Sequence, residues 1–297
     1  MLFQRLFNPR NPDRHAEELM ASLLVMAWMV EARDPYTGGH LWRVSRYARL
    51  LSEHMGLPAG TVDRISIGGF LHDLGKIGIP DHILNKRERL SDEEYEVIKT
   101  HPNAGLRMLA GHPLKALVQD AVALHHETPD GTGYPNQLSQ DHIPLDARIV
   151  GVCDAFDAMT STRPYRPGMP IAKALQIIEQ HLGQQFDSEI GRHFITLGLS
   201  GAFAHIVGHT DDGIPLHECP MCGPTLVIRK QQKAGSHVYC PSCTAEFVTE
   251  DGANGLVTKP TGNKGNARQV APEADIALIQ ALVKESAQAV SGLRLRA

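Results

Sequence analysis

The sequence predicts a mainly α-helical protein with a small cysteine-rich β module and a helix near its C-terminus. Apolar residues recur at steps of three and four, which is typical of amphipathic helices, and strand-like alternation is scarce before residue 219. Two Cys-x-x-Cys pairs, separated by residues 223–239, indicate the module. The helical periodicity covers residues 15–33, 40–55, 61–74, 114–126, 145–160 and 171–182.

Length and composition fit one sizeable domain with a smaller appendage. The chain has 297 residues, 42% of them hydrophobic, and a net charge of -4, which excludes a disordered chain and a nucleic-acid binder by bulk charge. The longest apolar stretch, Leu19 to Val30, is too short to span a bilayer. Glu17 and Glu18 before it, and the lack of a small-residue cleavage site after it, argue against a signal peptide. We therefore expect a cytoplasmic protein.

Capping and breaking residues mark the ends of several elements. Ser91 followed by Glu94 forms a capping box, and Pro102 places His101 near a helix end. Shifts in composition divide the rest of the chain into parts. One part is a connector rich in Gly, His and Asp, and we do not expect its histidines, His205, His209 and His217, to bind metal. The expected parts are a leader at 1–14, a principal domain at 15–199, the connector at 200–218, the cysteine module at 219–249, a flexible stretch at 250–271 and a last helix at about 272–293.

The cysteines suit a reducing compartment and one structural zinc ion. Cys219, Cys222, Cys240 and Cys243 have the spacing of two zinc knuckles, whereas Cys153 lies in an apolar run and is expected to pack. Basic residues follow the first knuckle, but the chain lacks a broad basic stripe with interleaved aromatics, so nucleic acid is not the expected partner. Protein docking or structural capping is favoured for the module.

A second set of metal-ligand residues is centred on the pair His72-Asp73. Imidazole together with carboxylate suits Fe, Mn or Zn better than Mg or Ca. An adjacent His-Asp allows the carboxylate to bridge two ions while the imidazole completes one, as in metal-activated hydrolases. Because these residues lie on or at the ends of several helices, we expect them to converge inside a bundle. The further candidates are His40, His101, His125, His126 and Asp154.

The blocks around these residues resemble the HD-GYP family of bacterial cyclic di-GMP phosphodiesterases, a branch of the HD-domain metal phosphohydrolases. The resemblance runs from Asp34 to Arg166 and implies an HD-domain helical bundle with two divalent ions, Fe or Mn. The matching blocks are DPYTGGHLWRV at 34–44, LHDLGKIGIPDHIL at 71–84, THP at 100–102, HHETPDGTGYP at 125–135, IPLDARIVGVCDAFDAMTSTRPYRP at 143–167 and QQFD at 184–187.

The resemblance implies a role for each ligand residue. Asp73 is expected to bridge the ions, with His72 and Asp154 on one and His101 and His125 on the other. His40 and His126 are expected to complete the shell, although a hydrogen-bonding role is equally open for His126.

A lysine follows this pair at helical spacing. Lys76 shares a helix face with His72 and Asp73 if the helix continues, which suits orienting a hydroxide or protonating the leaving oxygen. The resemblance implies this catalytic role for Lys76, and the alternative is a solvated surface lysine.

Substrate contacts are expected from two segments. Arg163 and Arg166 carry the planar forks that grip phosphates, unless they are ordinary surface charges. Gly133, Tyr134 and Pro135, with Gly131, form the loop that names the family. Tyr134 offers a stacking face for guanine, or the loop docks a protein partner.

One position departs from part of the family. Some members carry a Glu four residues before the first ligand histidine and bind three metals, whereas this chain has Tyr36 there. We therefore expect two ions and hydrolysis of cyclic di-GMP to linear pGpG, with GMP as a further product left open. The alternatives are an HD phosphohydrolase for another cyclic nucleotide, and a catalytically weak cyclic di-GMP sensor or scaffold. A homodimer is also left open.

Overall fold

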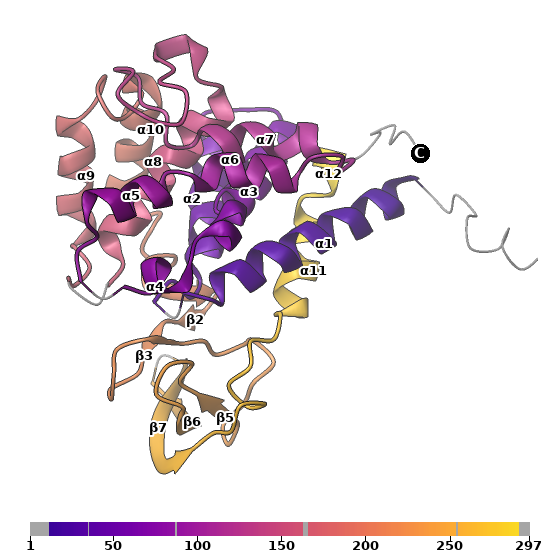
Figure 1. Cartoon of the computed structure of the whole chain (residues 1–297), viewed down its shortest axis with the longest axis vertical. Coiled ribbons are helices and arrows are strands. Elements are labelled where there is room, and N and C mark those ends of the chain that lie inside the picture. The colour runs from indigo at the N-terminus through magenta and orange to yellow at the C-terminus, as the bar shows by residue number, and fades with distance from the viewer. Residues whose placement is uncertain (1–11, 35, 87, 163–165, 254, 291–297) are drawn as a thin grey trace, which may run out of the picture.

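The computed structural model describes residues 12–34, 36–86, 88–162, 166–253 and 255–290, and it has two parts. A body of helices occupies the upper part of Figure 1, and a smaller β module lies below it. The predicted mainly α-helical fold with a C-terminal β module is confirmed. No helix in the described part of the chain is long and apolar enough to cross a membrane.

The six helices indicated by periodicity are all present, and each lies within a few residues of its expected range. Their bounds are α1 Pro12–Glu31, α2 His40–His54, α3 Ala59–Leu71, α7 Lys115–Leu124, α8 Leu145–Thr160 and α9 Ile171–Gln180. The remaining helices of the body are α4 Asp81–Leu84, α5 Asp92–Ile98, α6 His101–Met108 and α10 Ser188–Leu199, with 3-10 turns η2 Leu74–Gly78 and η3 Gln140–His142.

Local signals set two of these helix starts as expected. The Ser91 hydroxyl accepts from the Glu94 amide at 3.3 Å, and the Glu94 carboxylate accepts from the Ser91 amide at 2.7 Å, so the capping box opens α5. Helix α6 begins at His101, with Pro102 in its first turn, where the missing amide hydrogen costs no helical bond. The expected position of His101 at a helix end is confirmed.

An aromatic cluster between α2, α8 and α10 forms part of the core of the body. Tyr47 and Phe156 pack edge to face with ring centroids 5.2 Å apart, and Phe194 lies 5.1 Å from Phe156. Phe203, from the expected connector, lies 4.6 to 5.2 Å from all three rings. Residues after 199 therefore belong to the core of the body, and the plain connector expected for 200–218 is wrong at its start.

The β module is built from short antiparallel strands. Strands β1 His209–Asp211 and β2 Ile214–Pro215 pair with each other, as do β3 His217–Glu218 and β4 Thr225–Leu226. A three-stranded sheet has the order β5-β6-β7. Its strands are β5 His237–Tyr239, β6 Ala245–Gly252 and β7 Gly255–Lys264.

The flexible stretch expected at 250–271 is wrong over most of its length. Strand β7 pairs with β6. Side-chain hydrogen bonds add to this pairing, because the Glu246 carboxylate on β6 accepts from the Thr261 hydroxyl at 2.7 Å and from the Asn263 side-chain amide at 3.0 Å. Because β7 is an edge strand whose side chains are mostly exposed, it needs no apolar pattern, and periodicity does not reveal it.

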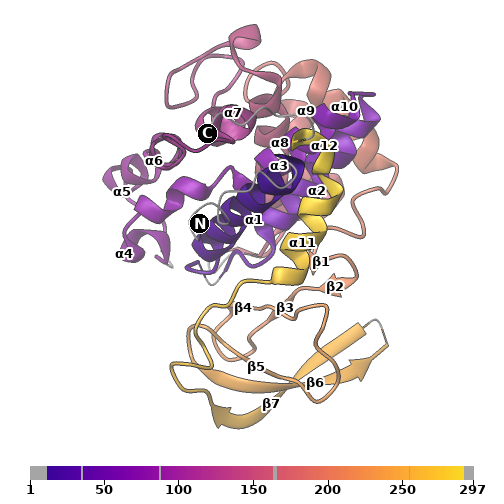
Figure 2. The same cartoon turned by 90° about the vertical axis from the view of Figure 1, so that its right-hand side faces the viewer.

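The last helix returns to the body and lies along α1 (Figure 2). It is divided into α11 Ile276–Glu285 and α12 Ala287–Val290, and the expected residues 291–293 lie outside the described ones. Asp275 caps α11 by accepting from the Leu278 amide at 3.0 Å. Ile279 and Leu282 are buried. The last helix therefore packs on the body of the same chain.

Truncation of Phe203 tests whether the segment after α10 is part of the core. We expect Phe203→Ala to lower the free energy of unfolding by about 3–5 kcal/mol, because it removes a fully buried ring from the aromatic cluster. Urea unfolding followed by circular dichroism measures the change. Leu199→Ala, at a side chain that is 70% exposed, is the control and should change stability by no more than about 0.5 kcal/mol. If Phe203→Ala changed stability as little as Leu199→Ala, Phe203 would not be part of the core.

Candidate metal centre

The His72-Asp73 pair lies where the α-helical path of α3 stops. Leu71 is the last residue of α3, His72 is its C-cap, and Asp73 precedes the 3-10 turn η2. The tighter turn places Lys76 above Asp73, with Nζ 2.6 Å from Oδ2. Lys76 is therefore beside Asp73, although the continuous α-helix assumed for His72, Asp73 and Lys76 is wrong.

A glycine explains why the chain turns here. Gly75 packs so closely on α6 that a Cβ would overlap the His101 carbonyl oxygen and the Gly105 amide. Only glycine allows this backbone contact, which brings Asp73 beside His101. In the same way, Gly151 of α8 lies where a Cβ would be 2.7 Å from the His125 carbonyl oxygen.

The ligand-type side chains form two groups with Asp73 between them. The ligand atoms of His40, His72 and Asp73 all lie within 4.8 Å of one another, and so do those of His101, His125 and His126. Asp73 Oδ2 is 3.3 Å from His72 Nε2, while Oδ1 is 3.4 Å from His101 Nε2. Each carboxylate oxygen thus faces one group, which is the arrangement that a bridging ligand requires.

Asp154 joins the first group from α8. Its Oδ1 lies 3.5 Å from His40 Nε2 and 3.8 Å from His72 Nε2. It is the most exposed carboxylate of the centre, with 19% of its side chain accessible. All seven residues expected as ligands are therefore close together.

Backbone carbonyls fix three of the imidazole rings. His72 Nδ1 donates to the Gly69 carbonyl at 2.7 Å, and His101 and His125 donate in the same way to Ile98 and Ala121 at 2.8 Å. Because a carbonyl only accepts, the proton lies on Nδ1 and Nε2 presents its lone pair to the centre. Burial lowers the pKa of His101 and, more strongly, that of His125, so both rings are neutral ligands at pH 7.

His126 is held by the glycine loop that follows it. Its ring stacks on Tyr134 with centroids 4.6 Å apart, and its carbonyl accepts from the Tyr134 amide at 3.1 Å. Gly133 lies where a Cβ would be 2.5 Å from that carbonyl oxygen. Burial lowers the pKa of His126 to about 3, so it too is neutral. Lys99 Nζ also lies over the Tyr134 ring, 5.7 Å from its centroid, so the ring that is expected to stack on a base already contacts an imidazole and an ammonium.

His40 differs from the other histidines because a carboxylate fixes its ring. Its Nδ1 lies 2.8 Å from Asp157 Oδ2, and Arg43 binds the same carboxylate through Nε at 2.6 Å and Nη2 at 3.0 Å. Burial opposes protonation of His40, but the hydrogen bonds to Asp157 and Asp73 outweigh it and raise its pKa to about 9. Neither Arg43 nor Asp157 is among the sequence candidates. Each stands three residues after a ligand, His40 or Asp154, on the same helix, which is the signal that could have found them.

Arg166 does not face the metal centre in this structure. Its guanidinium donates to the carbonyls of Ala158 and Met159, at 2.6 and 3.1 Å, and so caps the C-terminus of α8. Arg163, the other expected phosphate ligand, lies outside the described residues.

An open cleft of about 690 Å³ adjoins the centre at Lys76. Tyr36 and Tyr95 line it, together with the cations Lys86 and Arg89. Lys86 is paired with Glu94 at 2.6 Å, whereas Arg89 is exposed. Sequence reasoning missed this cleft, although the basic run at residues 86–89 was the available signal.

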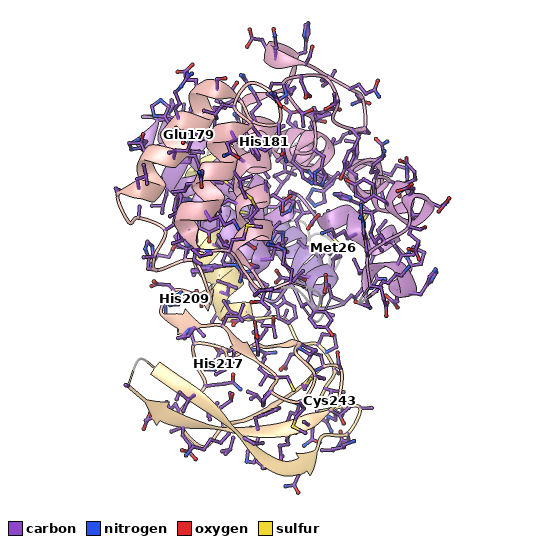
Figure 3. The ribbon with its side chains drawn as sticks, turned by 90° about the vertical axis from the view of Figure 1, so that its left-hand side faces the viewer. Met26, Glu179, His181, His209, His217 and Cys243 are labelled. Carbon is purple, nitrogen blue, oxygen red and sulfur yellow. The ribbon has the colours of Figure 1, made fainter. Side chains whose placement is uncertain are left out.

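The four module cysteines fit one tetrahedral ion. Sulfur separations are 3.5 Å between Cys222 and Cys240, 3.7 Å between Cys219 and Cys243, and 3.8 Å between Cys219 and Cys222. Metal-sulfur bonds of about 2.3 Å in a tetrahedron place the sulfurs about 3.8 Å apart. Burial opposes ionisation of Cys243, but the Ala245 amide and the neighbouring thiols lower its pKa to about 7. Cys243 lies in the module, away from the body, in Figure 3.

The chain belongs to the HD-domain family, whose family model matches residues 24–190. The adjacent pair His72-Asp73, with a group of histidines on either side of Asp73, lies within the matched residues. It also confirms the resemblance drawn from the sequence motifs.

The chain is similar to several cyclic dinucleotide phosphodiesterases. A cyclic di-GMP phosphodiesterase of Pseudomonas aeruginosa is 40% identical over 167 residues, 56% of this chain and 40% of the relative. A cyclic di-GMP phosphodiesterase response regulator of Xanthomonas campestris is 40% identical over 63% of this chain and 49% of the relative. The 3'3'-cGAMP-specific phosphodiesterase 3 of Vibrio cholerae is 40% identical over 63% of this chain and 41% of the relative. The chain thus spans less than half the length of each.

The charge on His40 predicts proton release when a metal binds. Because a proton and an ion compete for Nε2, and the pKa is about 9, metal binding at pH 7 should release about one proton, and apparent affinity should rise with pH up to about 9. Calorimetric titration with Mn²⁺ in two buffers of different ionisation enthalpy measures the release. His40→Asn should release fewer protons. Equal heats in both buffers for the unaltered protein would contradict the assignment.

Proposed function

We propose that this protein is a metal-dependent phosphodiesterase that hydrolyses a cyclic dinucleotide, with cyclic di-GMP as its substrate. The observation that carries the proposal is Asp73, whose two oxygens face two separate groups of imidazoles. The relatives named above act on cyclic di-GMP or 3'3'-cGAMP, which supports the substrate class.

The residues present fit two ions, and we propose Fe or Mn. Two such ions would supply a hydroxide at neutral pH and neutralise the charge that develops on the phosphoryl oxygens. Asp73 would bridge them, with His72, Asp154 and His40 on one side. His101, His125 and His126 would hold the other. Tyr36 stands where a third-metal carboxylate would be needed, so we propose hydrolysis that stops at linear pGpG.

Lys76 is the proposed acid of the reaction. Its ammonium lies 2.6 Å from Asp73 and also lines the open cleft, so it stands between the metal ligands and the space for substrate. Burial opposes ionisation of Asp73, but the charge of Lys76 and a hydrogen bond from His40 hold its pKa well below the ordinary value. Asp73 therefore stays a carboxylate while Lys76 orients the attacking group or protonates the leaving oxygen.

The substrate would lie in the cleft beside Lys76. Arg89 and Tyr95 line it and supply a cation and a ring, while Tyr134 stacks at the metal centre. We retain Arg163, Gly133 and Pro135 as proposed substrate contacts. A phosphate role for Arg166 would require it to leave the α8 carbonyls that it now caps.

Three further assignments complete the proposal. We place a structural zinc ion at the four module cysteines, on their sulfur separations. We place the enzyme in the cytoplasm, on cysteines that are free and suited to metal. The glycine loop and the module are the proposed docking surfaces for a protein partner, and a homodimer is the proposed assembly to test first.

Removal of Asp73 tests the hydrolase. Mn- or Fe-loaded protein should convert cyclic di-GMP to pGpG, resolved by chromatography, and Asp73→Ala should lower turnover by about 10³-fold or more, because both ions lose their common ligand. A run with 3'3'-cGAMP measures selectivity. Tight binding of cyclic di-GMP without conversion by the unaltered protein would favour the sensor instead.

Replacement of Lys76 tests its role in proton transfer. Lys76→Ala should lower kcat by about 10²- to 10⁴-fold while the metal content measured by emission spectroscopy stays unchanged. Lys173→Ala, an exposed lysine on α9, is the matched control and should keep full turnover. If the Lys76 variant retained wild-type kcat, the acid role would be wrong.

A further inference from the structure

The loop before His40 rests directly on the β module. At Gly38 a Cβ would be 2.8 Å from the Thr225 methyl group, and at Gly39, whose φ is 77°, it would be 2.6 Å from the Thr210 Cα. Both threonines are buried. The two glycines directly before His40 therefore lie against β1 and β4, with no side chain of their own in between.

Arg43 makes a second connection from the module to the same histidine. Its Nη1 donates to the His209 carbonyl at 2.9 Å and to the Gly38 carbonyl at 3.1 Å, while the rest of the guanidinium binds Asp157. The guanidinium is planar, so these partners cannot shift independently. Asp157 in turn fixes the His40 ring. Figure 3 shows His209 at the junction between body and module.

The first zinc knuckle lies close to these contacts in the chain and in space. Thr225 follows Cys222 by three residues, and the knuckle is closed by hydrogen bonds from the Gly223 amide to the Cys219 carbonyl and from the Cys219 amide to the Pro224 carbonyl, both 2.8 Å. A Cβ at Gly223 would be 3.8 Å from the ring of Tyr36, which lines the cleft beside Lys76. The knuckle thus adjoins both the His40 loop and the cleft.

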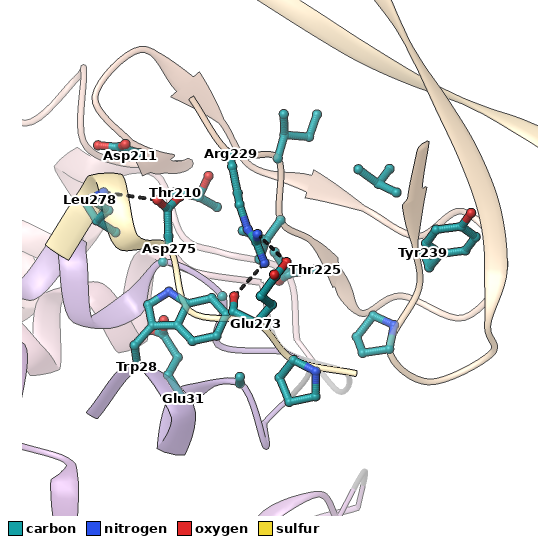
Figure 4. A pocket seen from close by; sticks show the side chains of 18 of the residues that line it. Trp28, Glu31, Thr210, Asp211, Thr225, Arg229, Tyr239, Glu273, Asp275 and Leu278 are labelled. Atoms are coloured by element: carbon teal, nitrogen blue, oxygen red, sulfur yellow. Dashed lines mark hydrogen bonds and ion pairs between the residues drawn. The ribbon is translucent and has the colours of Figure 1, made fainter. Parts of the chain in front are cut away.

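Much of the remaining junction is open. A cavity of about 690 Å³ separates α1 from the module and is lined by Trp28 and Glu31 on one side and Arg229 on the other (Figure 4). Arg229 pairs with Glu273 at 2.9 Å across this space. Gly38, Gly39, Thr210 and Thr225 also line this cavity, so the contact between the loop before His40 and the module borders it.

We propose that the closed cysteine module is a positioning element of the metal centre, which holds His40 through Thr225, Thr210 and the His209 carbonyl. Zinc at the four cysteines then sets the affinity of the His40 side for its own ion. Thr210, Thr225 and Arg43 are positioning residues in this scheme. The inference rests on the metal centre proposed above and adds a control over it by a second metal.

A double-mutant cycle at the contact tests the link. Gly38 has no left-handed backbone, so Gly38→Ala acts through close contacts, chiefly with the Thr225 methyl group at 2.8 Å and also with a Val227 methyl group at 3.0 Å. Gly38→Ala should weaken Mn²⁺ binding at the His-Asp centre by about tenfold, measured by electron paramagnetic resonance titration. Thr225→Ser, which removes the closest of these methyl groups, should change binding by less than about twofold alone and restore part of the loss in the double variant. A wild-type affinity for Gly38→Ala would overturn the proposal.

Opening of the knuckle provides an independent test that does not need metal at the centre. In the full-length protein, Cys222→Ser should increase amide hydrogen exchange over residues 38–44 while exchange in α9 stays unchanged. Lys259→Ala, an exposed change on β7 of the same module, is the control and should leave exchange at 38–44 as it is.

The two readouts separate this inference from the proposed function. Unchanged exchange at 38–44 in Cys222→Ser would overturn the link even if the protein hydrolyses cyclic di-GMP. Absence of Mn²⁺ binding by the unaltered protein would instead defeat the metal centre, and the exchange comparison would still decide whether the module holds the His40 loop.

Discussion

Burial of five imidazoles and three carboxylates in one place is the constraint on which the rest of the structure depends. Such groups cost several kcal/mol each when they leave water without partners. In three rings, a hydrogen bond from Nδ1 to a backbone carbonyl offsets the loss of water, and in His40 a hydrogen bond from Nδ1 to Asp157 does so. Every one of these partners also fixes the direction of the ring. The interactions that make burial tolerable therefore also aim the Nε2 atoms at the centre.

Close backbone approach is the second requirement of the same cluster. Gly75 lets η2 lie on the first turn of α6, Gly151 lets α8 approach α7, and Gly133 lets the loop lie on His126. Any side chain at these positions would push a ligand-bearing element away from its neighbour. The glycines thus act through the spacing of the helices, which sets the separation of the candidate ligands.

The β module belongs to the support of this centre. Phe203 anchors the chain that leads to it in the aromatic core, and α11 returns from it to the body. Between these two anchors, Arg43 spans from the His209 carbonyl to Asp157, so that the module and the metal ligand share one buried guanidinium. Substitution in the module can therefore reach the centre through hydrogen bonds of fixed geometry.

The sequence alone determined the six periodic helices, the capping box at Ser91, the four zinc-spaced cysteines and the seven residues that meet at the metal centre. These features follow from the spacing of residues and from motifs, and both can be seen in short stretches of the sequence. Only the tertiary structure decided that Arg43 pairs with Asp157, 114 residues away, that Arg166 caps α8, and that β7 pairs with β6. The spacing from His40 and Asp154 can point to Arg43 and Asp157 one by one, but no local pattern shows that they pair with each other, and an exposed edge strand needs no apolar pattern. Each of these interactions is a contact between residues that come together only when the chain has folded.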